Sequence, residues 1–105
     1  MLRVRPAVFH ILLALASGDR HGLGIADEVE HASGGAVDLG PGTLYRSLAE
    51  MVDDGLVQLV RPQRLPADPR RKYYRITAAG RTALKAEAER LQRIVGMARA
   101  RKVLS

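Results

Sequence analysis

Residues 39–55, LGPGTLYRSLAEMVDDG, predict a helix that presents one polar face to a partner. Gly40-Pro41 marks the start of this helix, because proline suits the first helical turn, where its missing N–H would have no partner anyway. Apolar side chains recur at helical spacing and form one face, made of Leu44, Leu48 and Met51. The opposite face carries polar side chains, namely Thr43, Arg46, Ser47 and Glu50.

Two short strands are predicted after this helix, over residues 56–61 and 72–77. In the second, Tyr74 and Ile76 alternate with Tyr73 and Arg75, which is the period-2 pattern of a half-buried strand. The loop between the two strands holds three prolines and three arginines. A helix followed by a hairpin with a cationic tip is the outline of a winged helix-turn-helix, a module whose usual partner is duplex DNA.

The rest of the chain is predicted to be helical, over residues 6–17, 22–32 and 78 to about 102. The predicted fold is therefore mainly α, within the α+β class. It comprises a winged helix-turn-helix with three helices and a two-stranded β-wing, followed by a long C-terminal helix. Residues 1–77 form the expected DNA-binding domain and residues 78–105 the expected dimerisation helix, in one compact unit.

The last predicted helix favours a homodimer. At 1.5 Å per residue it is about 37 Å long, too long to bury its apolar stripe against so small a domain. The first helix is apolar on both sides and also needs to be covered. The predicted interface combines Phe9 and Ile11 with the stripe Leu84, Ala88, Leu91, Ile94, Val95 and Ala98. The alternative is a last helix that folds back on its own domain.

Composition excludes several classes of site. The 105 residues contain no cysteine, which excludes disulfides, thiolate nucleophiles and cysteine-ligated zinc and fits a cytoplasmic protein. The net charge of +6 is unevenly distributed, since residues 1–54 sum to −4 and residues 55–105 to +10. A basic second half suggests a polyanionic partner near the hairpin. The apolar run near the N-terminus is too short to span a membrane, so no membrane partner is expected.

These residues together resemble the PadR family of transcriptional regulators, in its shorter form with a single C-terminal helix. The matching motifs are His-Gly-Leu-Gly-Ile at 21–25, Leu-Gly-Pro-Gly-Thr-Leu-Tyr at 39–45, Arg-Lys-Tyr-Tyr at 71–74 and Thr-Ala-Ala-Gly at 77–80. The resemblance covers about residues 7–99. Leu23 stands where family members often have tyrosine, and Gly40 where they often have a serine or threonine cap.

The resemblance implies a repressor that binds a pseudo-palindromic operator as a homodimer. Thr43, Arg46 and Ser47 are the candidates for reading base edges in the major groove, and Arg46 would bind either a guanine or a phosphate. Tyr45 would be either a core residue or a phosphate contact. The expected backbone contacts of the wing are Arg64, Arg70, Arg71 and Lys72. The family often responds to small aromatic or hydrophobic effectors, but the absence of tryptophan disfavours drug stacking on the last helix.

Two other function classes fit the sequence less well. A winged helix used only for protein–protein contact would bind DNA weakly and without a steep salt dependence, and the basic wing argues against it. An enzyme is not expected, because no Ser–His–Asp set, metal-ligand spacing or phosphate-binding loop is present. No cofactor or metal is therefore predicted. His21 precedes the second helix and is interpreted as a structural residue that holds a backbone carbonyl or a phosphate.

Overall fold

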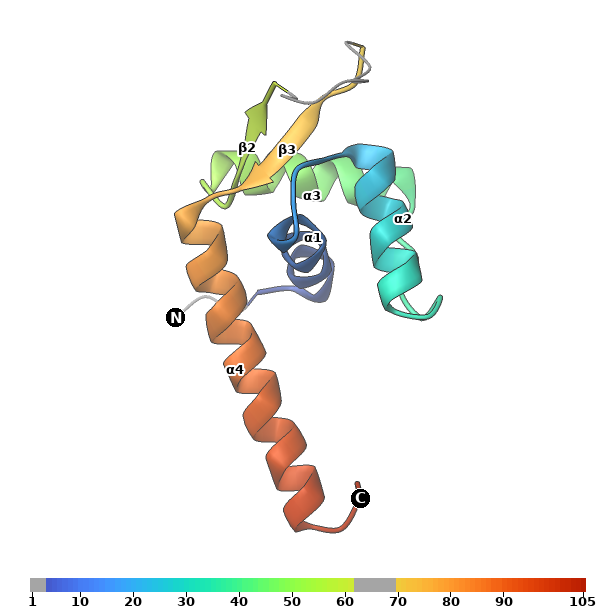
Figure 1. Cartoon of the computed structure of the whole chain (residues 1–105), viewed down its shortest axis with the longest axis vertical. Helices are drawn as coiled ribbons and strands as arrows, with labels where there is room; N and C mark the ends of the chain where they lie inside the picture. Colours follow the sequence, from blue (N-terminus) through green and yellow to red (C-terminus); the bar gives the residue numbers. More distant parts are fainter. Residues whose placement is uncertain (1–3, 62–69) are drawn as a thin grey trace.

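A computed structural model of the chain describes residues 4–61 and 70–105. A small sheet lies on one side of three helices, and a fourth helix extends away from the domain (Figure 1). This is the predicted winged helix-turn-helix. The elements in chain order are α1 (Pro6–Ala16), β1 (Arg20–His21), α2 (Gly22–Ala32), α3 (Pro41–Asp53), β2 (Val57–Val60), β3 (Tyr73–Ile76) and α4 (Ala78–Ala100).

The sheet has three strands in the order β1-β3-β2, and both pairings are antiparallel. In the hairpin, Val57 lies opposite Ile76 and Val60 opposite Tyr73, while β1 places Arg20 opposite Tyr74. The predicted two-stranded wing is confirmed, and β1 adds a third strand to the sheet that was not predicted. Strand β1 contains only two residues, so it is too short to produce an alternating pattern in the sequence.

Helix α1 forms the centre of the core. It packs against α2, α3, β3 and α4, and its Ile11 and Leu12 are completely buried. Ile11 was predicted to lie in the dimer interface, and this was wrong because its own domain already covers it. On α1 it is Leu13, 47% exposed, that points away from the core.

A glycine turn connects α3 directly to β2. Gly55 has a φ of +74°, a left-handed conformation that favours glycine. Its N–H donates to the carbonyl of Val52 at 3.1 Å, and the N–H of Leu56 donates to that of Met51 at 2.9 Å. These two bonds form a Schellman motif, which satisfies the last carbonyls of α3 and reverses the chain into the hairpin.

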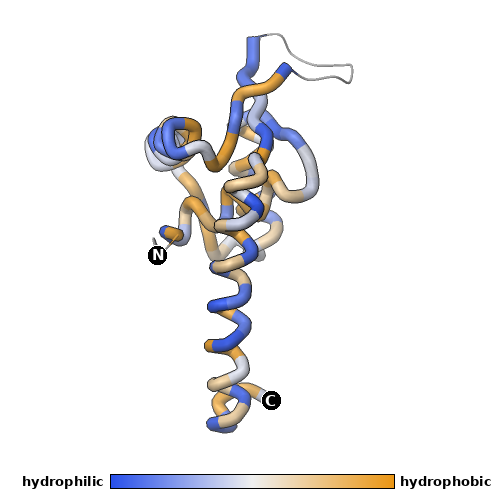
Figure 2. Tube along the Cα trace, turned by 90° about the vertical axis from the view of Figure 1, so that its left-hand side faces the viewer, coloured by the Kyte–Doolittle hydropathy of each residue, from blue (hydrophilic) through white to orange (hydrophobic). Residues whose placement is uncertain are grey.

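Helix α4 begins at a side-chain cap and extends well beyond the domain. The hydroxyl of Thr77 accepts a hydrogen bond from the N–H of Gly80 at 3.0 Å. At 23 residues the helix is about 35 Å long. Its N-terminal part packs on α1, and its C-terminal part stands clear of the other elements (Figure 2). The molecule is consequently elongated, 51 Å long and 29 by 25 Å across.

Candidate nucleic-acid interface

Helix α3 exposes three of the four side chains that were predicted to contact DNA on this helix. Thr43, Tyr45 and Arg46 are exposed, and 53% of Tyr45 is accessible to solvent. Ser47 is only 6% exposed, so its assignment to the outward face was wrong. Ser47 lies three residues after Leu44, and this helical spacing places it on the inward side of the helix. Its small size lets it fit there.

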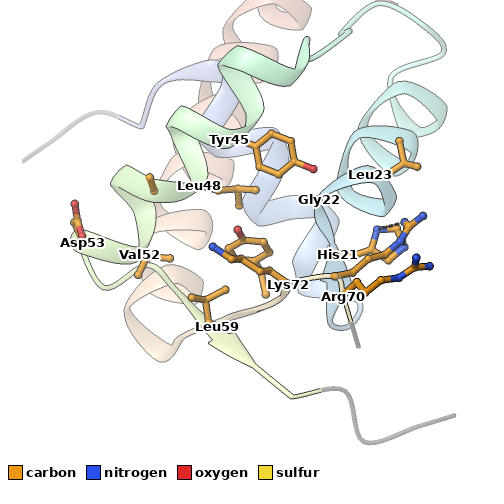
Figure 3. Close-up of a pocket in the computed structure, with 13 residues that line it drawn as sticks. His21, Gly22, Leu23, Tyr45, Leu48, Val52, Asp53, Leu59, Arg70 and Lys72 are labelled. Atoms are coloured by element: carbon orange, nitrogen blue, oxygen red, sulfur yellow. Dashed lines mark hydrogen bonds between the residues drawn. The ribbon is translucent and has the colours of Figure 1, made fainter. Parts of the chain in front are cut away.

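A groove runs between α3 and the hairpin and reaches the first turn of α2 (Figure 3). Its volume is about 850 Å³. The groove is lined by His21, Gly22, Leu23, Tyr45, Leu48, Ala49, Val52, Asp53, Leu59, Arg70, Arg71, Lys72 and Tyr74. It therefore joins Tyr45 of the candidate recognition helix with three predicted backbone contacts of the wing.

Tyr45 lies across the start of α2. A Cβ atom built on Gly22 would meet the Tyr45 hydroxyl at 2.7 Å and its ring at 2.8 Å. Glycine at position 22 therefore lets the phenol approach the α2 backbone closely, with its hydroxyl directed toward α2 (Figure 3). The sequence left open whether Tyr45 is a core residue, and its exposure places it at the surface.

His21 holds the first turn of α2 together. Its Nδ1 accepts a hydrogen bond from the N–H of Gly24 at 3.1 Å, which caps the helix. Nη1 of Arg71 lies 3.1 Å from Nδ1 and 3.0 Å from Nε2, and the ring meets Tyr73 edge to face. The structural interpretation of His21 is supported, although it accepts from a backbone N–H rather than holding a carbonyl. It also ties α2 to the start of β3.

The cations that immediately precede β3 line one side of the groove. Arg70, Arg71 and Lys72 are all exposed. Arg75, further along β3, donates to both carboxylate oxygens of Asp19 at 3.0 and 2.8 Å, and these hydrogen bonds raise its pKa. Arg75 is therefore engaged within the protein. Arg64, the remaining predicted wing contact, lies outside the described residues.

The basic residues of the second half divide between two places. Of the thirteen in residues 55–105, seven lie between Arg81 and Lys102, on α4 and its end. The expectation that this charge is concentrated near the hairpin was therefore only partly correct. The net charge of this half of the sequence does not show which basic residues line the groove and which lie on α4. The fold places these two groups of basic residues apart.

The C-terminal part of α4 carries the apolar stripe that was predicted to form a dimer. Leu91, Ile94 and Val95 are 36%, 47% and 39% exposed. Leu84, by contrast, is partly buried against the core of its own domain, and Phe9 is half-buried on α1. Ala88 is exposed and Ala98 partly so. The unpartnered stripe therefore begins about one turn later than the sequence predicted.

Sequence reasoning missed the apolar part of the groove. Leu23 and Leu59 are 53% and 52% exposed, and Tyr74 is 7% exposed. Leu59 falls within the strand predicted over residues 56–61, but no periodic signal marks a leucine that points outward from so short a strand. In the described part of the chain, no three His, Cys, Asp or Glu side chains are grouped to hold a metal ion. Nor is any helix there long and apolar enough to cross a membrane.

Tyr74 gives a prediction at high pH. Burial raises the pKa of its phenol above the ordinary 10.0, and the nearby Tyr45 raises it further. Between the pKa of Tyr74 in the unfolded chain and its higher pKa in the folded protein, the phenol keeps its proton only in the folded state. The free energy of unfolding therefore falls as pH rises from about 10. We expect Tyr74→Phe to lose less stability than the wild type between about pH 9 and 11 in urea titrations. An identical loss in both proteins would contradict this assignment.

Comparison with known proteins identifies the family. Residues 11–86 match the model of the transcriptional regulator PadR-like family. The chain is 37% identical to a transcriptional regulator of Mycobacterium tuberculosis over 91 residues. These aligned residues make up 86% of this chain and 80% of that protein. It is 39% identical over 95 residues to an uncharacterized 37.1 kDa transposon protein of Streptomyces fradiae, which covers 90% of this chain. The chain spans only 26% of that longer protein.

Solved structures share the fold. A PadR family transcription regulator of Clostridium difficile superposes with a TM-score of 0.76 at 24% identity, over 90% of this chain and 95% of that one. Bacillus subtilis PadR in complex with operator DNA superposes with a TM-score of 0.66 at 22% identity, over 78% of this chain and 46% of that one. The extent of the family match, together with the identity to the mycobacterial regulator, settles the assignment. This chain belongs to the PadR-like family, whose members are transcriptional regulators rather than enzymes.

Proposed function

We propose that this protein is a repressor that binds a pseudo-palindromic operator as a homodimer. The observation that carries the proposal is the groove, where Tyr45 of α3 faces the same space as Arg70, Arg71 and Lys72 of the hairpin. A recognition helix beside a cationic hairpin suits duplex DNA, because the helix enters the major groove while the cations follow the phosphates. The operator complex of Bacillus subtilis PadR, which shares this fold, supports the proposal.

In this proposal α3 reads the bases. Thr43 and Arg46 are exposed in its first two turns, the part of a recognition helix that reaches base edges. The planar guanidinium of Arg46 suits O6 and N7 of a guanine, and it also suits a phosphate. Tyr45 and the cations that precede β3 would hold the DNA backbone and set the register of α3 in the major groove of the DNA.

The homodimer would form through the exposed stripe of α4. Leu91, Ile94 and Val95 lie on one side of a helix that extends beyond its own domain, with Ala88 and Ala98 beside them. Two such helices, one from each protomer, would bury both stripes at once. A two-fold axis between them would present the recognition helices to half-sites about 34–36 Å apart or a multiple of that distance. The family resemblance adds release from DNA by a small hydrophobic or aromatic effector.

The proposal is tested by fluorescence anisotropy on the promoter of the protein's own gene, with a scrambled duplex as control. Between 50 and 200 mM salt, we expect the promoter to be preferred by about 10³-fold or more. We also expect a log–log salt slope of several units, since each phosphate contact contributes about 0.9. Weak, unselective and salt-insensitive binding would contradict it and favour a winged helix used for protein–protein contact.

Arg46→Ala and Lys72→Ala should separate base contacts from phosphate contacts. If Arg46 reads a guanine, its loss should cost about 1–3 kcal/mol on the operator and relax specificity at one base pair. Loss of Lys72 should weaken binding to all duplexes alike and lower the salt slope by about 1. Lys72 is the better choice than Arg71, which also contacts His21.

Anisotropy titrations on the operator, on its single-base variants and on random DNA measure both effects. Arg93→Ala is the matched control, because Arg93 is an exposed cation on α4, away from the groove. Equal losses on operator and random DNA for Arg46→Ala would assign Arg46 to a phosphate instead of a base.

A further inference from the structure

The groove carries an apolar surface that contact with DNA phosphates does not require. Leu23 on α2 and Leu59 on β2 are each more than half exposed. Val52 of α3 lines the same groove and is partly exposed, whereas Leu48 of α3 lies there with no accessible surface, so that aliphatic side chains from three elements form one concave space. Large apolar side chains scattered singly over a surface need no explanation, but a concave group of them marks a binding site.

The size of the groove suits a small molecule. Its volume of about 850 Å³ lies within the range of about 300–1,000 Å³ typical of ligand sites. Such sites combine a mostly apolar lining with a few polar groups that orient the ligand. Here Tyr45 and Tyr74 supply two phenols and Lys72 an ammonium group.

The charges around the groove select the sign of the ligand. Arg70, Arg71 and Lys72 all belong to the lining, whereas Asp53 is its one carboxylate among the described residues. Figure 3 shows Asp53 at one end of the groove and Arg70 with His21 at the other. A ligand with one negative group would bind with that group at the Arg70 end, away from Asp53, and with its apolar part along the aliphatic side chains.

We propose that this groove binds an organic anion with an aliphatic tail, such as a medium-chain fatty acid, in competition with DNA. The carboxylate pairs with the cations that precede β3, and the tail covers Leu59 and the accessible part of Val52. The ligand occupies the space beside Tyr45, so operator and fatty acid exclude each other. The competition rests on the proposed function, whereas binding of the fatty acid does not. The site lies on the face of α3 itself and needs no second subunit.

Direct binding is measured by isothermal titration calorimetry of the full chain with decanoate below its micellar concentration. We expect one decanoate per chain. Acetate, which has no tail, and 1-decanol, which has no charge, should each bind at least about tenfold more weakly. Leu59→Gln should weaken decanoate binding at least about tenfold. The matched control is Leu104→Gln, because Leu104 is 47% exposed near the C-terminus, outside the groove, and this variant should bind as the wild type does.

Leu23→Gln tests the opposite wall of the groove, and circular dichroism of each variant confirms that it is folded. No binding of decanoate, or equal binding by the Leu59 and Leu104 variants, would overturn the proposal. Anisotropy on the promoter then tests the competition. Decanoate should weaken DNA binding by the wild type and much less by Leu59→Gln. Decanoate that binds without weakening DNA binding would overturn the shared site, and a chain that binds decanoate but no DNA would contradict only the proposed function.

Discussion

Gly80→Ala is expected to destabilise the protein by about 3 kcal/mol or more, at the upper end of the cost of overpacking. A Cβ atom at position 80 would lie 2.2 Å from the carbonyl oxygen of Leu56 and 2.8 Å from Cγ1 of Ile76. The first of these atoms is backbone and cannot rotate away. A change of rotamer therefore cannot relieve the clash, and α4 would have to move away from the hairpin.

That movement would break the junction between sheet and helix. The carbonyl of Leu56 accepts the N–H of Thr77 at 3.1 Å, and the hydroxyl of Thr77 donates to the carbonyl of Gly55 at 2.6 Å. The same hydroxyl caps α4 by accepting the N–H of Gly80. Displacement of α4 thus breaks its cap together with its attachment to β2, and loss of a cap alone costs about 1 kcal/mol.

Gly96→Ala is the matched control in the same helix. A Cβ atom at Gly96 meets nothing within 4 Å, and an alanine there should stabilise α4 by up to about 1 kcal/mol. Urea denaturation of both variants, followed by circular dichroism, should shift the midpoints in opposite directions. Equal stability of the two alanine variants would show that the contact between Gly80 and Leu56 is not tight in solution.

Leu91→Glu is expected to convert the proposed homodimer to a monomer and to reduce operator affinity by about 10²-fold or more. Leu91 lies within the exposed stripe of α4, between Ala88 and Ile94. A carboxylate there would be buried without a partner when two stripes meet, which strongly disfavours the dimer. A monomer contacts one half-site only. It therefore loses the gain in affinity of about 10²–10⁴-fold that comes from linking two binding modules.

Ala86→Glu places the same charge elsewhere on α4. Position 86 is exposed and lies about 140° around the helix from position 91, so the added carboxylate faces water. Sedimentation velocity should report one protomer for Leu91→Glu and two for Ala86→Glu, and anisotropy should show a loss of operator binding for the first variant alone. A Leu91→Glu protein that still sediments as a dimer would place the interface elsewhere.

Local signals predicted the helices well. Helix α2 was expected over residues 22–32 and forms there. Its core positions recur at helical spacing, and a glycine pair with positive φ follows its end and closes the helix. Helix α3 begins at Pro41 as expected, and both hairpin strands lie inside their predicted ranges. Helix α4 begins at Ala78 as predicted and ends at Ala100, two residues before the predicted limit. In all these elements the deciding interactions span only a few residues, so the sequence reports them directly.

Which side chains face outward was predicted less well. Ser47 was placed on the polar face of α3 and is buried, while Ile11 was placed in the dimer interface and is part of the core. A periodic pattern shows that positions share a face of a helix, but it does not show how much of that face the neighbouring elements cover. That coverage depends on contacts between residues far apart in the chain.

The sequence by itself determined the helices, the hairpin, the family motifs and the basic character of the second half of the chain. Only the tertiary structure decided that Arg20 and His21 add a third strand, that Tyr45 lies over Gly22, and that Leu23 and Leu59 converge on one groove. The physical reason is the range of the interactions. Helix caps, turns and periodic faces arise within a few neighbouring residues, whereas a groove exists only where α2, α3 and the hairpin come together.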